Sequence, residues 1–519
     1  MRLSSWVQLY HTVKYLKAKQ IYYRLYYMIR GKIRKGLSLR YPLSRPSMVR
    51  GLSLQESIHI QDSYLRGDKF SLLNLSKSFE DGIDWNYAEY GKLWTYNLTY
   101  FDFLSQEGIK EEGKALIYDF IESSHNIKDG MEPFPISLRG INWIKFLSFY
   151  KIEDQKIEDA LYAQYDILYQ NLEYHLLGNH LLENGFSLLF GAYYFEDEML
   201  YKKATEILRE QLKEQVLEDG GHFERSPMYH QIMLFRLLDC INLLQNNDWK
   251  SESSLLIELR GIAEKMLGWL DAISFEEGDI PLFYDSAQKI APTTQELFSY
   301  AHRLGCVPKL ISLGKSGYRK VRRSKYEAIL NVGGIAASYI PGHAHADIFT
   351  FELRLQQHRP FIVDTGLSTY ERGDRRTLER STRAHNTVEI YGRNQSDVWG
   401  GFRVGRRAEV IELEVLCDGN LIRGTHNGYA PLHHTRKWYF DENNLLIQDR
   451  LNQPDQEGIF RLHFHPDISK EEILARVSSS EPFVFEEYLY APEFNKHYQA
   501  IVLKIPFQGS LEVKISLGA

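Results

Sequence analysis

The sequence predicts a multidomain protein in which a run of antiparallel helices is followed by an antiparallel β-sandwich. Three observations support this fold class. The chain has 519 residues, which at about 150 residues per domain predicts two to four domains. Apolar residues recur at helical spacing from about residue 60 to 310, and in the last 200 residues or so they alternate instead with polar ones.

Several long segments joined by short breaks carry the helical pattern. They are residues 157–177, 181–195, 201–217, 227–244 and 254–273. Helical segments that follow one another without intervening strands predict helical pairs rather than alternating strands and helices.

A different period begins after a basic link at residues 314–325. Phe351, Leu353 and Leu355 alternate with polar residues, and the same alternation returns at residues 511–517. Turn-forming residues at 441–444 separate strand-like runs. This pattern predicts an antiparallel β-sandwich in the last part of the chain.

The composition, 44% hydrophobic and 25% charged, is that of a globular protein. Cys240, Cys306 and Cys417 form no close pair, which argues against a disulfide framework or a cysteine zinc site. No apolar run is long enough to span a membrane. The first 20 residues lack the apolar core of a signal peptide, so we expect a cytoplasmic protein, or a periplasmic or secreted one if a leader has been removed.

The first 50 residues form a basic N-terminal arm. They contain twelve Lys or Arg and no Asp or Glu. Because the whole chain has a net charge of −6, the remaining 469 residues have a net charge of −18. Such an arm suits an anionic polymer or an anionic membrane face. The interpretation we favour is a helix packed on the rest of the chain, which is acidic, because apolar residues in the arm follow a helical stripe. They are Trp6, Val7, Leu9, Tyr10, Val13 and Leu16.

A first chemical motif lies at residues 179–184, at the front of a predicted helix. Asn179, His180 and Glu183 lie on or near one helical face. An amide, an imidazole and a carboxylate together can hold, neutralise and deprotonate a polar substrate. The alternative is helix capping by Asn179, with Glu183 in a supporting role.

A second motif spans residues 219–230. Ser226 and Pro227 predict the start of a helix, which places Tyr229 in the first turn. A phenol becomes a useful acid or base when cations lower its pKa. Three neighbours could supply them: Arg225, His222 and His230. The alternative is a tyrosine that packs between helices.

A third motif lies at residues 342–347, directly before an alternating strand. In a strand, His343, His345 and Asp347 would share one face, suited to metal binding or acid–base work. His345 with the later Asp364 and His385 would make a ligand set of two nitrogens and one oxygen, which suits zinc or manganese. The alternative is a pair of solvent-facing histidines.

An arginine-rich loop follows at residues 370–383. Close arginines favour anions such as carboxylate or sulfate, or pairing with the acidic residues of the same loop. The arginines are Arg372, Arg375, Arg376, Arg380 and Arg383, and the acids are Glu371, Asp374 and Glu379.

Together these motifs resemble the heparinase II/III family of polysaccharide lyases. The words NHLLENG, DGGHFERSPMYH, HAHAD, VDTG and RSTRAHNTV occur in that family's order, and the similarity covers roughly residues 90 to 470. The resemblance implies an (α/α) toroid of helical hairpins followed by an antiparallel β-sandwich, with the active site in the cleft between them. The domains expected are 1–50, the basic arm; 51–315, the toroid; and 316–519, the sandwich.

The resemblance also implies β-elimination at a 4-linked uronic acid. Asn179 would bind the uronate carboxylate, with Glu183 shaping that pocket. Tyr229 would protonate the leaving oxygen and, for one epimer, take the C5 proton. His180 and His343 match the family's other acid–base histidines, which would allow both glucuronate and iduronate.

The remaining residues implied by the resemblance are metal ligands and cleft residues. His345, Asp364 and His385 match a structural divalent metal site, with zinc expected first and manganese second. Four further residues would contact the substrate: Arg139, Asn142, Trp143 and Arg225.

The expected partner is an anionic uronate polysaccharide such as heparan sulfate, chondroitin sulfate or hyaluronan, with no nucleic acid and no transmembrane segment. Alginate or a bacterial uronate exopolysaccharide is the alternative substrate, and a non-catalytic polysaccharide-binding assembly protein is an alternative function. Two further classes are a metal-dependent amidohydrolase, built on His-x-His, and a glycoside hydrolase, built on Glu183 and Asp285. The sequence leaves the oligomeric state open.

Overall fold

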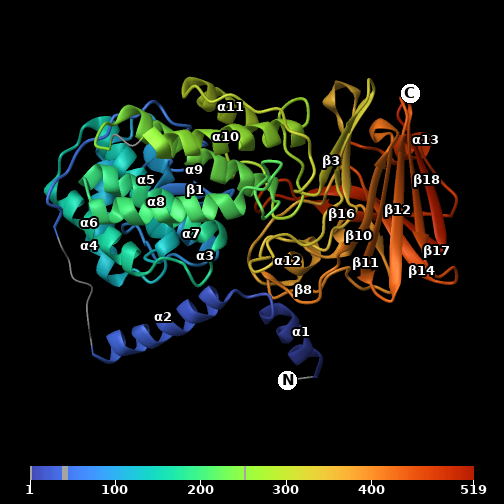
Figure 1. The fold of residues 1–519 in the computed structure, drawn as a ribbon, viewed down its shortest axis with the longest axis horizontal. Helices are drawn as coiled ribbons and strands as arrows, with labels where there is room; N and C mark the ends of the chain where they lie inside the picture. The colour runs from blue at the N-terminus through green and yellow to red at the C-terminus, as the bar shows by residue number, and fades with distance from the viewer. Residues whose placement is uncertain (1–2, 38–44, 251–252, 519) are drawn as a thin grey trace.

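The computed structural model describes residues 3–37, 45–250 and 253–518. A helical toroid and a β-sandwich lie side by side, and the N-terminal arm runs along one edge of both (Figure 1). One apolar core fills the toroid and a second lies between the sheets of the sandwich. The fold class predicted from the sequence is confirmed.

The arm consists of helices α1 and α2, and a short hairpin, β1 and β2, precedes the toroid helices. Their bounds are α1 Leu3–Val13, α2 Ala18–Gly36, β1 Lys69–Leu72 and β2 Leu75–Ser78. The toroid helices are α3 Lys92–Tyr100, α4 Lys110–Ser123, α5 Pro133–Tyr150, α6 Gln155–Gln170, α7 Gly178–Phe195, α8 Glu198–Gln215, α9 Pro227–Asn246, α10 Ser253–Ile273 and α11 Thr294–Arg303.

Helix α7 is the centre of the toroid. Nearly all of its residues are buried, and it packs on α5, α8 and α9. A helix that is buried all round must be covered by partners on every side, which is what the surrounding hairpins provide. The five predicted helical segments correspond to α6 to α10.

The sandwich contains one six-stranded and two four-stranded antiparallel sheets within the described residues. The six-stranded sheet has the order β10-β11-β12-β13-β18-β15, and the others are β16-β17-β14-β7 and β3-β4-β5-β6. The bounds are β3 Tyr318–Arg322, β4 Tyr326–Asn331, β5 Phe351–Leu355, β6 Pro360–Ile362, β7 Val388–Glu389, β10 Val410–Leu416, β11 Leu421–Tyr429, β12 Leu432–Phe440, β13 Asn444–Leu451, β14 Glu457–His463, β15 Val477–Ser479, β16 Val484–Tyr490, β17 Tyr498–Gln508 and β18 Ser510–Ser516.

Short elements complete this half of the molecule. They are the two-stranded β8 Val398–Trp399 and β9 Arg403–Val404, and the helices α12 Asp374–Glu379 and α13 Lys470–Arg476. The predicted alternation at residues 351–355 and 511–517 corresponds to β5 and β18. Among the described residues, every helix is too short or too polar to cross a bilayer.

The segment from 341 to 350 is a loop, which corrects the expectation that His343, His345 and Asp347 lie on a strand. Only at its end do backbone groups bond to a strand, where Phe349 and Thr350 pair with Asn331 of β4, and the earlier residues bond to segments outside the sheets. The His343 carbonyl accepts from the Asp285 amide at 3.1 Å, and the Ala346 amide donates to the Arg380 carbonyl at 3.0 Å. This loop therefore brings the sandwich against the toroid.

Candidate active site

The start of α9 positions Tyr229. Ser226 Oγ accepts a hydrogen bond from the Tyr229 backbone N–H at 3.1 Å, and Pro227 occupies the first turn, where no N–H donor is needed. The same Ser226 hydroxyl donates to the Asp285 carbonyl at 2.7 Å. The helix start predicted from the sequence is confirmed, and the cap also fastens the segment that carries Asp285.

Tyr229 of the toroid and His343 of the sandwich lie face to face. Their ring centroids are 3.9 Å apart, with 31° between the planes. The Tyr229 hydroxyl lies 3.2 Å from that of Tyr370, which comes from the arginine-rich loop. The His343 side chain is 12% exposed, so one edge of the imidazole remains open to solvent. A phenol and an imidazole from different domains thus share one small site.

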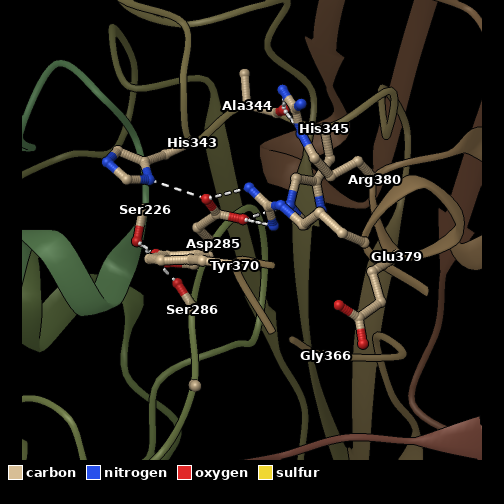
Figure 2. Close-up of polar contacts among 12 residues, drawn as sticks. Ser226, Asp285, Ser286, His343, Ala344, His345, Gly366, Tyr370, Glu379 and Arg380 are labelled. Carbon is tan, nitrogen blue, oxygen red and sulfur yellow. Dashed lines mark hydrogen bonds and ion pairs between the residues drawn. The ribbon is translucent and has the colours of Figure 1, made fainter. Parts of the chain in front are cut away.

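Asp285 lies between His343 and His345 and bonds to both (Figure 2). Its Oδ2 accepts from His343 Nδ1 at 2.9 Å, and its Oδ1 accepts from His345 Nε2 at 2.8 Å. Burial alone would raise the pKa of Asp285, but the Arg376 guanidinium and both imidazoles hold that pKa well below its usual range. The carboxylate therefore keeps the proton of His343 on Nδ1 and leaves Nε2 as an acceptor.

Asn179 and Glu224 face the Nε2 side of His343. Asn179 Nδ2 donates to Glu224 Oε2 at 3.0 Å and lies 3.5 Å from His343 Nε2. Glu224 Oε2 itself lies 3.6 Å from that nitrogen, and burial raises the pKa of Glu224. Gly178, at φ 60°, lets the chain pass close to Glu224, since a Cβ there would lie 3.1 Å from Glu224 Oε1. Asn179 is thus held by Glu224 and does not cap α7, whose N-cap is Leu177.

His180 lies nearby on the same first turn of α7. Its Nδ1 lies 3.0 Å from Glu173 Oε1, and its ring packs on Phe134 at 4.7 Å. Burial lowers the pKa of His180, but the Glu173 carboxylate outweighs burial and the net pKa is raised. About a third of the side chain is exposed, so the imidazole can exchange protons with solvent or ligand.

The phenol of Tyr229 has no cation of the predicted kind beside it. Burial raises the pKa of Tyr229. Burial also lowers the pKa of His230 to about 3 and that of His222 well below its usual range, so both are neutral. The Arg225 guanidinium donates to the Gly334 carbonyl at 2.8 Å. Tyr229 is therefore a protonated phenol at rest, which suits a proton donor.

Three residues expected to contact substrate have fully buried side chains. Glu183 forms an ion pair with Arg236 at 2.9 Å, and burial raises the pKa of Glu183 to about 7. Arg139 Nη1 donates to two backbone carbonyls, at 2.9 Å each, and the Trp143 ring packs on Phe101 at 5.4 Å. All three side chains are 0% exposed, so the expectation that Arg139 and Trp143 line the cleft is not met, and Glu183, expected to shape the Asn179 pocket, pairs with Arg236 in the core.

Two other expected contact residues hold the backbone. Asn142 is partly buried and donates to the Tyr100 carbonyl at 2.9 Å and to Asp102 Oδ1 at 2.6 Å. Arg225 reaches away from Tyr229 to the segment that links the two domains, where its Nη2 donates to the Lys315 carbonyl at 3.3 Å. In this structure both residues stabilise the scaffold around the site.

The arginine-rich loop is paired mainly within the protein. Arg375 Nε donates to Glu379 Oε1 at 2.7 Å, and Arg380 donates to the Ala344 and Gly401 carbonyls. Arg376 binds Asp285, with 2.7 Å between Nη2 and Oδ2. Arg372 and Arg383 are exposed. The loop thus orders the site, and two of its arginines remain open to an anion.

The predicted metal residues meet in the buried part of the same region. The His345 and His385 rings are 5.3 Å apart, and His345 Nδ1 and His385 Nε2 are buried without a hydrogen-bond partner. Asp364 Oδ2 lies 2.8 Å from His385 Nδ1, while Asp285 bonds the other nitrogen of His345. The two free nitrogens are placed as metal ligands would be, and the two carboxylates orient the imidazoles as outer-shell residues of a metal site do. Asp364 lies as the residue that orients His385.

Sequence reasoning missed Glu224 and Tyr370 and met Asp285 only as a hydrolase acid. Glu224 lies inside the second motif, among the candidate residues His222, Arg225 and Tyr229. Asp285 occurs in a segment without a recognisable pattern, and Tyr370 opens the arginine-rich loop, whose pattern lies in its charged residues. Their contacts join residues 58 and 141 positions apart, and local spacing holds no signal for such pairs.

The chain is therefore a two-domain protein, with a helical toroid, a β-sandwich and a tyrosine–histidine pair where the two meet. The family model described as "Heparinase II/III N-terminus" matches residues 88–304, and the family model "Heparinase II/III-like, C-terminal" matches residues 307–495. The chain belongs to the heparinase II/III family.

Two curated relatives are heparin-sulfate lyases. One, from Bacteroides stercoris, is 25% identical over 56% of this chain and 46% of its own length. The other, from Pedobacter heparinus, is 24% identical over 70% of this chain and 56% of its own. The matched part spans about half the length of these relatives.

Among solved structures, heparinase III matches with a TM-score of 0.67 and 16% identity, covering 99% of this chain and 94% of that one. The heparan sulfate lyase HepC from Pedobacter heparinus matches with a TM-score of 0.53 and 17% identity, covering 87% and 82%. These likenesses support the fold.

Proposed function

We propose that this protein is a polysaccharide lyase that cleaves glycosaminoglycans at 4-linked uronic acids by β-elimination. The observation that carries the proposal is the contact of Tyr229 with His343, ring to ring at 3.9 Å, beside the Asn179 amide. The heparin-sulfate lyase relatives support the same chemistry.

The first step is to make the C5 proton acidic. An ionised carboxylate on C5 disfavours a carbanion there, so hydrogen bonds must neutralise the charge of that carboxylate. Asn179 Nδ2 supplies a donor whose position is set by Glu224 at 3.0 Å. Burial raises the pKa of Glu224, the carboxyl group that holds Asn179 in place.

The second step moves two protons. A base takes the proton from C5, the C–H electrons form the C4–C5 double bond, and the C4–O bond breaks. His343 Nε2 is the acceptor on the sandwich side, because Asp285 holds the proton on Nδ1. Tyr229, kept protonated by its raised pKa, gives its proton to the leaving oxygen. His180 is a second base, placed on the toroid, which would serve the other uronate epimer.

A structural metal site belongs to the same proposal. His345 and His385 would hold a divalent ion, zinc first and manganese second, and Asp364, expected from the sequence as a third ligand, would orient His385. The two buried imidazole nitrogens without a partner support it. When bound, the ion would cross-link the loops that carry His343 and His385.

The other enzyme classes fit the site less well. A glycoside hydrolase would need Glu183 and Asp285 as opposed carboxyls on the cleft, but both are fully buried and pair with arginines. An amidohydrolase would place His-x-His on a strand of a barrel, whereas residues 341–350 form a loop next to antiparallel sheets.

The test is a panel of uronate polymers followed by the ultraviolet absorbance of the unsaturated product. Heparan sulfate, chondroitin sulfate and hyaluronan are the expected substrates, with alginate as the alternative. Tyr229→Phe should lower the elimination rate by roughly 10²–10⁴-fold while polymer binding is kept. Tyr391→Phe, an exposed tyrosine of the sandwich, is the matched control and should keep the rate.

Three outcomes would contradict the proposal. Chain cleavage without ultraviolet absorbance would indicate a hydrolase. Polymer binding without turnover, unchanged in Tyr229→Phe, would indicate a binding protein. A Tyr229→Phe variant with the wild-type rate would remove the assigned proton donor.

A further inference from the structure

Helix α2 contacts the toroid through one face only. Gln20 Nε2 donates to the Leu176 carbonyl at 2.9 Å, and the Tyr27 hydroxyl to the Leu172 carbonyl at 2.5 Å. Tyr23 stacks on Tyr174 with 4.7 Å between the centroids. Positions 20, 23 and 27 lie on one side of a helix, so this side is the inner face.

The opposite face of α2 is apolar and exposed. Its residues follow the helical spacing of a buried stripe, and their exposures are 61%, 51%, 43%, 54% and 52% for Tyr22, Leu25, Tyr26, Ile29 and Ile33. A surface helix normally turns such a stripe to the core. Here the stripe faces away from the protein, which marks an interaction surface.

Helix α1 continues this arrangement. Thr12 faces the sandwich and accepts a hydrogen bond from Trp399 Nε1 at 3.2 Å. Trp6, Val7 and Tyr10 are exposed, the aromatic pair at 59% and 65%. In Figure 1 both helices lie along the same edge of the molecule, α2 beneath the toroid and α1 beneath the sandwich. We call the exposed apolar side of α1 and α2 the arm face.

The charge of the arm indicates an anionic partner. Part of it is used inside the protein, because Lys17 and Lys19 form ion pairs with glutamates of α8. Lys14, Lys32 and Lys35 are exposed, and within the described residues none of them has an ion pair. No acidic residue occurs in positions 1–50 to attract a cationic surface.

We propose that the arm face docks the protein on an anionic lipid surface, with the apolar residues at the level of the headgroups and the free lysines beside the phosphates. Amphipathic basic helices with tryptophan and tyrosine on the apolar side bind membranes in this way. A second copy of the chain is a poorer occupant, because two arms would bring like charges together. Docking is independent of the proposed lyase chemistry, since Tyr229 and His343 lie outside the arm.

The test uses the full chain and sedimentation with vesicles. Vesicles of phosphatidylcholine with about one third phosphatidylglycerol should bind the protein, and pure phosphatidylcholine vesicles should bind it more weakly, since each free lysine contributes roughly fivefold. Leu25→Glu with Ile29→Glu should lower vesicle binding by about tenfold or more. The matched control is Ile257→Glu with Leu474→Glu, two exposed apolar residues outside the arm.

Lys32→Glu with Lys35→Glu tests the electrostatic part and should lower vesicle binding most at low salt, so that the difference from the wild type shrinks as salt is added. Circular dichroism and the thermal midpoint check that each variant folds. Equal binding to both kinds of vesicle, or equal binding by the Leu25 and Ile29 variant, would overturn the proposal. A dimer in light scattering that dissociates in that variant would assign the arm face to a second copy and would also overturn it.

Discussion

Replacing Asp285 by Asn tests the link between the two domains most directly. Four donors converge on its two oxygens: His343 Nδ1, His345 Nε2 and two nitrogens of Arg376. An amide of the same shape has one oxygen and one NH₂ group. In either orientation, two of the four donors would meet an NH₂ group and lose their acceptor.

The magnitude follows from burial. Asp285 is 0% exposed and Arg376 is 1% exposed, so water cannot replace the lost bonds. Removing the charge of one partner of a buried pair costs about 3–5 kcal/mol. At about 2 cal/mol/K of unfolding entropy for each of the 519 residues, the thermal midpoint should fall by roughly 3–5 °C. Because His343 also loses the group that sets its tautomer, elimination should slow by roughly 10²-fold or more.

The assay pairs thermal unfolding with the initial rate of elimination, measured well below the midpoint. Asp449→Asn is the matched control. Asp449 is equally buried and accepts from His434 and Arg436, at 2.6 and 2.7 Å, inside the sandwich core. It should lose similar stability and keep the rate. An Asp285→Asn protein with the wild-type rate, or an Asp449→Asn protein as slow as Asp285→Asn, would refute the reasoning.

Three further predictions follow from other contacts. Ser226→Ala should lower stability by about 1 kcal/mol and slow elimination, whereas Thr293→Ala, the N-cap of α11, should lower only stability; equal rates in both would contradict the role of the cap. Glu173→Gln should lower the pKa of His180, because the carboxylate that favours the imidazolium is gone, and shift its limb of the pH–rate profile to lower pH; an unmoved limb would count against it. Dialysis against a chelator, or His385→Ala, should lower the bound divalent metal, measured by mass spectrometry, together with the thermal midpoint; unchanged metal content in the variant would exclude this site.

Local chemistry was readable from the sequence. The start of α9 could be predicted because Ser226 and Pro227 act on their own helix turn. The switch from helical to alternating spacing likewise predicts the order of the two domains. Tyr229 and His343 were found because their motifs resemble a known family, and the structure brings them into contact.

The sequence does not show which buried residues of a helix face the cleft and which face the core. Helix α5 is buried along most of its length, so its pattern does not distinguish the cleft from the core, and Arg139 and Trp143, predicted to contact substrate, lie in the core. The family resemblance predicts that Glu183 shapes the pocket beside Asn179, but Glu183 pairs with a buried arginine of α9 in the core. The partner that holds Asn179 is Glu224, 45 residues later in the chain.

The shared carboxylate of Asp285 has a consequence for recombination between relatives. Its carbonyl is bonded to the start of α9 in the toroid, whereas its side chain, among the described residues, bonds to His343, His345 and Arg376. A hybrid that joins this toroid to the sandwich of a relative keeps the Asp285 carboxylate but replaces the residues that donate hydrogen bonds to it. Such a hybrid must import matching histidines and arginine together, and a crossover near residue 305 succeeds only between parents that agree at both ends of that contact.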